Sequence, residues 1–130
     1  MPRRDLEDLA RLLADKAAGD EGVLEKLSRD RDIPDEVLGF HAQQAVEKLI
    51  KAVLAARGIQ PPRSHDVGYL LGLLEENGIQ PPPDASAVEG LTPWAAEFRY
   101  AESYGQSLDR VAALTLVRGA RSWARTQLPG

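Results

Sequence analysis

The alternation of apolar and polar positions predicts one long amphipathic helix at the centre of the chain, from about Pro34 to Arg57. Apolar residues recur there every three or four positions, as they do on one face of an α-helix at about 100° per residue. We expect that face to be buried. The opposite face is either a solvated surface or the lining of a polar contact, and it carries Phe40, His41 at its margin, Gln43, Gln44, Glu47, Lys48 and Lys51.

The flanking residues predict where this helix begins and ends. Pro34 suits the first turn, where a missing N–H costs nothing, and acidic residues follow it. Gly58 suits the left-handed residue that ends a helix, and two prolines then prevent continuation. The run Gly-Ile-Gln-Pro-Pro recurs twenty residues later, starting at Gly78, which we interpret as a second copy of the same stop signal.

The same periodicity predicts further helices on both sides. A first helix runs from about Arg4 to Ala18 and is interrupted by the run 19–22. Ser64 and Asp84 are the predicted N-caps of two later helices, because short polar side chains accept hydrogen bonds from the first free N–H groups. The second of these has Val88, Leu91, Trp94, Ala95 and Phe98 on its inward side.

The last helix is predicted from Ser107 to about Gln127. Its predicted apolar stripe is Leu108, Val111, Ala112, Thr115, Leu116, Gly119 and Trp123. No segment shows the sustained period-two alternation of a β-strand. The pattern therefore indicates an all-α protein, an up-and-down bundle of four to five helices.

Length and composition fit one domain over residues 1–130. The chain has no cysteine, which excludes disulfides and thiolate nucleophiles. No apolar run is long enough to span a membrane, and the first residues lack the apolar core of a signal peptide, so we expect a cytoplasmic protein with no membrane contact. A net charge of −4 argues against a whole-surface attraction to nucleic acid.

Only two histidines are available for acid–base chemistry. His65 follows Arg63 and precedes Asp66, and a neighbouring carboxylate can orient an imidazole as a general acid or base requires. The alternative is that this run only caps a helix. His41 is equally well explained as a border residue that hydrogen-bonds across the bundle.

Metal and nucleotide-loop motifs are missing from the sequence. Two histidines without an HExxH spacing do not build a metal site, so we expect no metal and no cofactor. Neither glycine-rich phosphate-binding pattern occurs. A nucleotide would have to be held by side chains and helix ends instead.

Four arginines of the last helix, at positions 110, 118, 121 and 125, fall within about 80° of one another on a helical wheel. We call them the basic edge. Guanidinium groups pair well with phosphate, which makes Arg118 and Arg121 candidate ligand-binding residues. A solvated edge paired with the acidic first helix explains them as well. Arg99 and Tyr100 could add a donor and a stacking ring, or could simply end their own helix.

Three pieces of the sequence, taken in order, resemble a known family. They are Phe40-His-Ala-Gln-Gln-Ala-Val-Glu-Lys-Leu-Ile-Lys51, Ser64-His-Asp-Val-Gly-Tyr-Leu-Leu71 and Phe98-Arg-Tyr100. The chain resembles the HEPN domain family over nearly its whole length, in the branch encoded beside a minimal nucleotidyltransferase. The resemblance implies a helical bundle, commonly homodimeric, that acts with a minimal nucleotidyltransferase in toxin–antitoxin-like pairs or binds nucleotides.

Many HEPN proteins are metal-independent ribonucleases with an Arg-x(4–6)-His motif late in the domain. This chain departs from that motif, because no histidine follows His65, and Arg57 precedes His65 by one position too many. Ala101 also stands where the family usually has a proline after the Arg-Tyr pair.

The leading hypothesis is a HEPN-type module that binds a nucleotide or RNA-like ligand and a nucleotidyltransferase. Arg99, Tyr100, Arg118 and Arg121 would hold phosphate and base, while a polar lining would comprise His41, Gln44, Lys48, Arg63 and His65. The enzyme alternative is a ribonuclease with His65 as general base and Arg63 or Arg99 stabilising the developing charge. A third reading is an interaction subunit without a ligand, which contacts its partner through Phe40 and the polar face of the central helix.

Overall fold

The computed structural model describes residues 2–95 and 107–128. The regular secondary structure of these residues is helical. Arg99 and Tyr100 lie outside these residues. The described part contains five α-helices and one 3₁₀ turn, with no β-strand, which confirms the all-α prediction. The elements are α1 (Arg3–Leu27), α2 (Asp35–Ala56), α3 (Val67–Glu76), α4 (Ala85–Glu89), η1 (Thr92–Trp94) and α6 (Arg110–Gln127).

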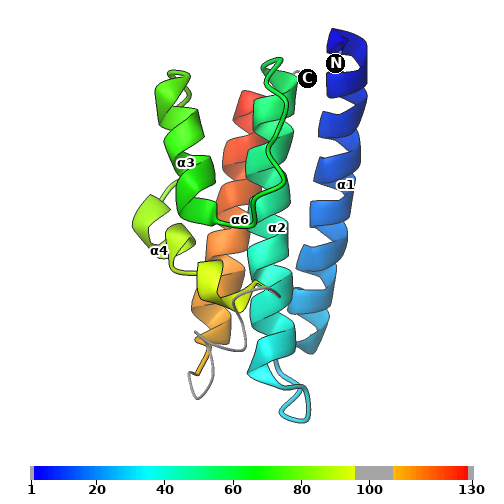
Figure 1. The fold of residues 1–130 in the computed structure, drawn as a ribbon. Helices are drawn as coiled ribbons and strands as arrows, with labels where there is room; N and C mark the ends of the chain where they lie inside the picture. Colours follow the sequence, from blue (N-terminus) through cyan, green and yellow to red (C-terminus); the bar gives the residue numbers. More distant parts are fainter. Residues whose placement is uncertain (1, 96–106, 129–130) are drawn as a thin grey trace.

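Helix α2 is the central element, and the other helices surround it (Figure 1). α1 runs antiparallel to α2 and packs along its length, while α6 covers another side. α3 and α4 lie on the side of the molecule away from α1. After α2, residues 57–66 run back along the bundle as an extended segment before α3 begins. This connecting segment runs alongside α2 instead of forming a tight hairpin.

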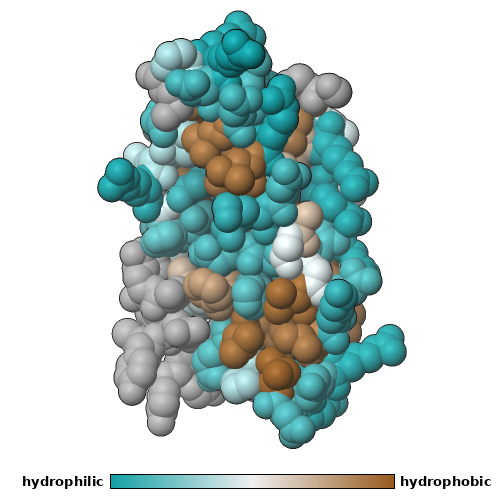
Figure 2. Space-filling model, turned by 90° about the vertical axis from the view of Figure 1, so that its right-hand side faces the viewer, coloured by the Kyte–Doolittle hydropathy of each residue, from teal (hydrophilic) through white to brown (hydrophobic). Residues whose placement is uncertain are grey.

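The face of the molecule that carries α1 is mostly hydrophilic (Figure 2). Apolar side chains nevertheless gather in two places on it. Leu12, in α1, is one of the few large apolar residues exposed by about half, at 51%. No helix in the described part is both long and apolar enough to cross a membrane.

The predicted ends of α2 and α3 are confirmed by backbone geometry. Gly58 and Gly78 both have positive φ, 81° and 67°, which a residue with a side chain rarely adopts. After each glycine, an isoleucine N–H donates back to a carbonyl five residues earlier, Ile59 to Leu54 and Ile79 to Leu74, both at 2.9 Å. The repeated Gly-Ile-Gln-Pro-Pro run is therefore two uses of the same helix stop.

The predicted interruption after Ala18 is wrong, because α1 continues without a break to Leu27. Gly19 and Gly22 are accommodated within the helix. The two residues between them are buried and bound to other helices, Asp20 to α2 and Glu21 to α6. These tertiary contacts offset the cost of about 1 kcal/mol that each glycine imposes on a helix.

Of the two predicted N-caps, Ser64 is wrong, whereas Asp84 does occupy the N-cap position of α4. Asp66 caps α3 by accepting from the N–H of Tyr69, while Ser64 Oγ accepts from the N–H of Asp66 one step earlier. Asp84 makes no capping bond, and its φ of 57° is left-handed. The helix after it ends at Glu89, and Trp94 belongs to a separate 3₁₀ turn. Val88, Leu91, Trp94 and Ala95 are nonetheless all buried, as predicted.

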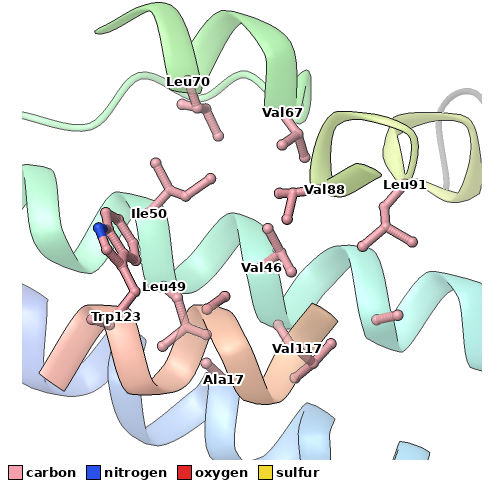
Figure 3. Packing of buried hydrophobic residues seen from close by; sticks show 14 of the residues in the cluster. Ala17, Val46, Leu49, Ile50, Val67, Leu70, Val88, Leu91, Val117 and Trp123 are labelled. Atoms are coloured by element: carbon pink, nitrogen blue, oxygen red, sulfur yellow. The ribbon is translucent and has the colours of Figure 1, made fainter. Parts of the chain in front are cut away.

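The core is built around the apolar face of α2. Leu38, Val46, Ile50 and Leu54 are fully buried, and side chains from the other helices close around them (Figure 3). Trp123 of α6 donates its indole N–H to the carbonyl of Gln80 at 2.8 Å, which ties the end of α6 to the segment after α3. Gly39 has no room for a Cβ, because the indole of Trp94 lies directly against it.

The buried stripe of α6 differs from the predicted one, and the helix begins at Arg110 instead of Ser107. The residues that face the core are mostly small, namely Ala113, Val117, Ala120, Trp123 and Ala124. Val111, predicted to be inward, is 77% exposed. Small side chains at such a contact favour a close approach of two packed helices.

Candidate functional site

The polar face of α2 is largely buried in the structure. Gln43 is inaccessible to solvent, and Glu47 and Lys51 are 4% and 9% exposed. The reason is the extended segment 57–66, which lies over this side of α2: Gln43 Nε2 donates to the main-chain carbonyl of His65 at 3.1 Å. The polar face is therefore a lining that is held against another segment, and it is not a solvated surface.

Glu47 is the centre of a polar cluster that we call the Glu47 cluster. Its Oε1 accepts from Gln43 Nε2 and from His65 Nδ1, both at 2.8 Å, and its Oε2 accepts from Lys51 Nζ at 2.9 Å. Gln44 Nε2 lies 2.7 Å from Gln43 Oε1 and 3.5 Å from Glu47 Oε1. A buried carboxylate is stable only with such donors around it.

The donors also decide the protonation of Glu47. Burial by itself would raise the pKa of this carboxyl, since it penalises the charged form. The hydrogen bonds from Gln43, Lys51 and His65, together with the charge of Lys51, outweigh burial and hold the pKa below its usual range. Glu47 is therefore a carboxylate at neutral pH, and it can orient the imidazole beside it.

His65 presents one fixed and one available ring nitrogen. A carboxylate can only accept, so the contact to Glu47 places the hydrogen on Nδ1. In the neutral ring Nε2 then carries the lone pair, and no other group in the described part of the chain hydrogen-bonds to this ring. The side chain is 43% exposed, and the exposed Arg63 lies two residues earlier. The extended segment thus brings an oriented imidazole and a guanidinium to the surface.

His41 belongs to a second cluster, formed where α1 meets α2. Asp20 of α1 accepts from His41 Nδ1 at 2.8 Å through Oδ1 and from Lys48 Nζ at 2.6 Å through Oδ2. Asp20 is almost buried, with 10% of its side chain exposed, while His41 and Lys48 keep 26% and 22% exposed. His41 does hydrogen-bond across the bundle. Lys48 and Gln44, one turn apart on α2, make the two clusters neighbours.

Three of the four arginines of the basic edge of α6 are paired with acids outside this helix. Arg121 Nη1 lies 2.7 Å from Glu21 Oε2, and Arg118 Nη2 lies 3.6 Å from Glu25 Oε2, so both pair with α1. Arg110 pairs with Asp35 at 2.9 Å. We call the Glu47 cluster and the second cluster around Asp20 together the histidine clusters. Within the described residues, no hydrogen bond or ion pair joins Arg118 or Arg121 to either of them.

Two parts of the site could not be seen in the sequence. Glu47 is on the polar face but looks like any solvated glutamate until segment 57–66 covers it. Asp20 lies between Gly19 and Gly22, in a run whose sequence is typical of a loop. The only available signal was spacing, because Gln43, Glu47 and Lys51 repeat every four residues and so share one side of a helix.

The described residues offer no group of three or more His, Asp or Glu side chains placed to hold a metal ion. What the arrangement can do is present hydrogen-bond donors, a basic ring nitrogen and cationic groups to a ligand. An anion with hydrogen-bonding oxygens, such as a phosphate, fits that set best.

Comparison with known proteins gives one result. The family model described as HEPN domain matches residues 10–125, which extends from α1 through the last turns of α6. No curated protein and no solved structure matches the chain.

Proposed function

Since the chain belongs to the HEPN domain family, we propose that it is a helical module that binds a nucleotide or RNA-like ligand and acts with a minimal nucleotidyltransferase partner. The observation that supports the ligand is the surface around His65. Glu47 orients this imidazole, Arg63 lies two residues away, and Gln44, Lys48 and His41 continue the polar surface along α2. We expect phosphate to lie near Arg63 and His65.

The proposed site contains two buried carboxylates, Glu47 and Asp20, and each is already bound to a lysine and a histidine. Asp66, next to His65, adds an exposed third carboxylate, so Lys48, Lys51 and Arg63 balance the acids of the site in number. Arg63 is exposed and forms no ion pair within the described part of the chain. It is therefore the cation of the site that is available to an anionic ligand.

The test is calorimetric titration of the protein with nucleoside mono-, di- and triphosphates and with a short single-stranded RNA. Arg63→Ala should weaken binding of the ligand by about tenfold or more, because a charge-assisted hydrogen bond is worth about 1.5–3 kcal/mol. Arg3→Ala is the matched control, since Arg3 is exposed at the N-terminal end of α1 and its one ion pair within the described residues is with Glu7. No binding of any of these compounds, or equal effects of the two substitutions, would refute the ligand proposal.

The place of Arg118 and Arg121 in the ligand site stays a prediction. Arg118 is the better probe, because its ion pair with Glu25 is exposed and contributes little to stability. If Arg118 contacts phosphate, Arg118→Ala lowers affinity without lowering the melting temperature. Unchanged affinity would leave the basic edge with the structural role that its pairing with α1 already gives it.

The Glu47–His65 contact also favours a second function, a metal-independent ribonuclease. A carboxylate that holds Nδ1 leaves Nε2 able to take the proton of a ribose 2′-hydroxyl while its oxygen bonds to the adjacent phosphorus. Arg63 or Arg99 could stabilise the negative charge on the phosphate oxygens until the bond to the 5′-oxygen breaks, and the leaving 5′-oxygen takes a proton from the imidazolium or from water. RNA cleavage should then vanish in His65→Ala and fall in Glu47→Gln. Cleavage that persists in purified His65→Ala would exclude this mechanism.

A homodimer is part of the proposal, and the α1 face supports it. This face exposes apolar side chains in two places, and Leu12 is half exposed (Figure 2). A pocket of about 360 Å³ lies between α1 and the ends of α2 and α6, with Ala10, Ala14, Ala56 and Leu128 among its walls. A protein that dimerises but binds no nucleotide or RNA would support the third function, an interaction subunit.

A further inference from the structure

The side of the molecule formed by α3 and α4 carries a groove that is separate from the histidine clusters. It has a volume of about 790 Å³ and lies between α3, the segment after it and α4. Most of its lining residues are apolar or glycine, namely Gly68, Leu71, Gly72, Gly78, Ile79, Pro81 and Ala85. The polar lining residues are Glu75, Gln80, Ser86 and Glu89.

The groove lies in a stretch without any basic side chain. From residue 64 to residue 95 the sequence has no lysine and no arginine. Glu75 and Glu89 line the groove itself. The acidic residues of the stretch are Asp66, Glu75, Glu76, Asp84 and Glu89, and none of them forms an ion pair within the described part of the chain.

Gly72 is not required by the fold. A Cβ built on this residue has nothing within 4 Å, and its φ is not in the left-handed region, so alanine would fit and would favour the helix by about 1 kcal/mol. What glycine provides is open space over the groove. Gly68, one turn earlier, differs from Gly72, because the carboxylate of Glu89 lies directly against it and already fills the space that a side chain would take.

An aromatic side chain stands beside this open space. Tyr69 is 52% exposed and precedes Gly72 by three residues, which places both on neighbouring positions of the α3 surface. Partly exposed tyrosines next to apolar grooves are frequent anchors of protein–protein contacts.

From these observations we propose that the α3–α4 groove is a docking surface for a basic amphipathic helix of a partner protein. Small side chains of that helix would pack over Gly72, and its lysines or arginines would pair with Glu75 and Glu89. The acidic rim repels phosphate, so nucleic acid and anionic membranes do not fit here. The groove shares no residue with the His65 surface, and the inference does not depend on the ligand proposed there.

The probe is a set of synthetic helical peptides of about 18 residues, roughly five turns, with one stripe of alanine and leucine. Two peptides share this stripe and differ only in whether the opposite face carries lysine or glutamate. The lysine peptide should bind and should lose affinity about tenfold between low and high salt, because exposed charges are screened. The glutamate peptide should not bind. Equal binding of both peptides, or of neither, would overturn the proposal.

Two substitutions locate the contact. Gly72→Leu should fill the groove and weaken binding of the lysine peptide at least tenfold, whereas Gly19→Leu, a matched change at an open glycine of α1, should leave it unchanged. The double variant Glu75→Lys with Glu89→Lys should weaken lysine-peptide binding and should allow the glutamate peptide to bind. Equal effects of the two leucine variants would place the contact elsewhere. Nucleotide titration of the Gly72→Leu protein should match the unchanged protein, which separates this surface from the His65 site.

Discussion

At the scale of single residues, the most informative group is the buried carboxylate of Glu47. Glu47 keeps its charge because three side chains donate hydrogen bonds to it. Its hydrogen bond to Nδ1 of His65 in turn fixes the orientation of that imidazole. An imidazole on an extended segment would otherwise sample several rotamers. Fixing the ring before a ligand arrives lowers the entropy cost of binding or of proton transfer.

Replacing Glu47 by alanine should destabilise the protein at neutral pH. Lys51 would be left as an almost buried charge without its partner, and breaking a buried ion pair in this way costs about 3–5 kcal/mol. Urea unfolding at pH 7 measures the loss. Glu76→Ala is the control, because Glu76 is exposed on α3 and should change the free energy of unfolding by less than about 0.5 kcal/mol. Similar losses in both variants would contradict the role given to the cluster.

The depressed pKa of Glu47 also predicts how stability depends on pH. The carboxylate contributes stability above its unfolded-state pKa, near the ordinary value of 4.5, and that contribution is lost as pH falls through the lower folded-state pKa. The protein should therefore lose stability below about pH 4.5. In Glu47→Gln this acid-dependent loss should be smaller, because the amide does not titrate. A variant with an unchanged slope would place the acid sensitivity in other groups.

At the scale of elements, one arginine holds the start of α6 to the loop between α1 and α2. Arg110 donates to Asp35 at 2.9 Å and to the main-chain carbonyls of Ser28, Asp30 and Ile33, at 3.2, 2.9 and 2.6 Å. The N–H of Leu108 donates to the same aspartate at 3.0 Å. The N–H of Leu108 contributes most to keeping the pKa of Asp35 below its usual range. Partial burial opposes this effect, and the guanidinium of Arg110 adds to it.

Arg110→Ala should lower the free energy of unfolding by about 2–3 kcal/mol, since it removes a largely buried, multiply bonded guanidinium. Arg110→Lys should recover only part of the loss, because an ammonium cannot reach all of these acceptors at once. Arg125→Ala, an exposed change on the same helix, is the control. Equal stability of the lysine and arginine proteins, measured by urea unfolding, would show that charge alone suffices.

The elements differ in how far the sequence could predict them, and the difference follows from the range of the interactions. The ends of α2 and α3 were predictable because a glycine followed by prolines acts locally. The continuity of α1 was not, since it depends on Asp20 meeting His41 and on Glu21 meeting Arg121, a hundred residues away. The N-cap of α3 was predicted wrongly for a more local reason. Several short polar residues compete for the same free N–H groups, and the turn geometry decides among them.

The candidate site was predictable in its residue types but not in its arrangement. His65 and Arg63 stand out as an imidazole and a guanidinium near a predicted helix start. The imidazole of His65 is oriented by Glu47, which lies on the polar face of α2. From the sequence alone this face is expected to be solvated, because the sequence does not show that segment 57–66 covers it. A helical wheel shows which residues share a side of one helix. It cannot show which segment covers that side.

At the scale of the whole molecule, the distribution of charge and apolar surface separates three faces. The histidine clusters lie where α2 meets α1 and segment 57–66, and the acidic groove lies at α3 and α4. The α1 face carries exposed apolar side chains (Figure 2). Separate faces would allow a ligand, a basic partner helix and a second copy of the chain to bind at the same time.

The homodimer prediction can be tested on the α1 face. Light scattering after size exclusion should give a mass twice that of the 14.2 kDa chain, and Leu12→Glu should shift the protein toward the monomer, because a charge in an apolar contact is costly to desolvate. Val111→Glu is the matched control. Val111 is 77% exposed at the end of the bundle where α6 starts, whereas Leu12 lies in the middle part of α1. A dimer that survives Leu12→Glu but dissociates with Val111→Glu would move the interface to that end, and a wild-type monomer at high concentration would refute the dimer itself.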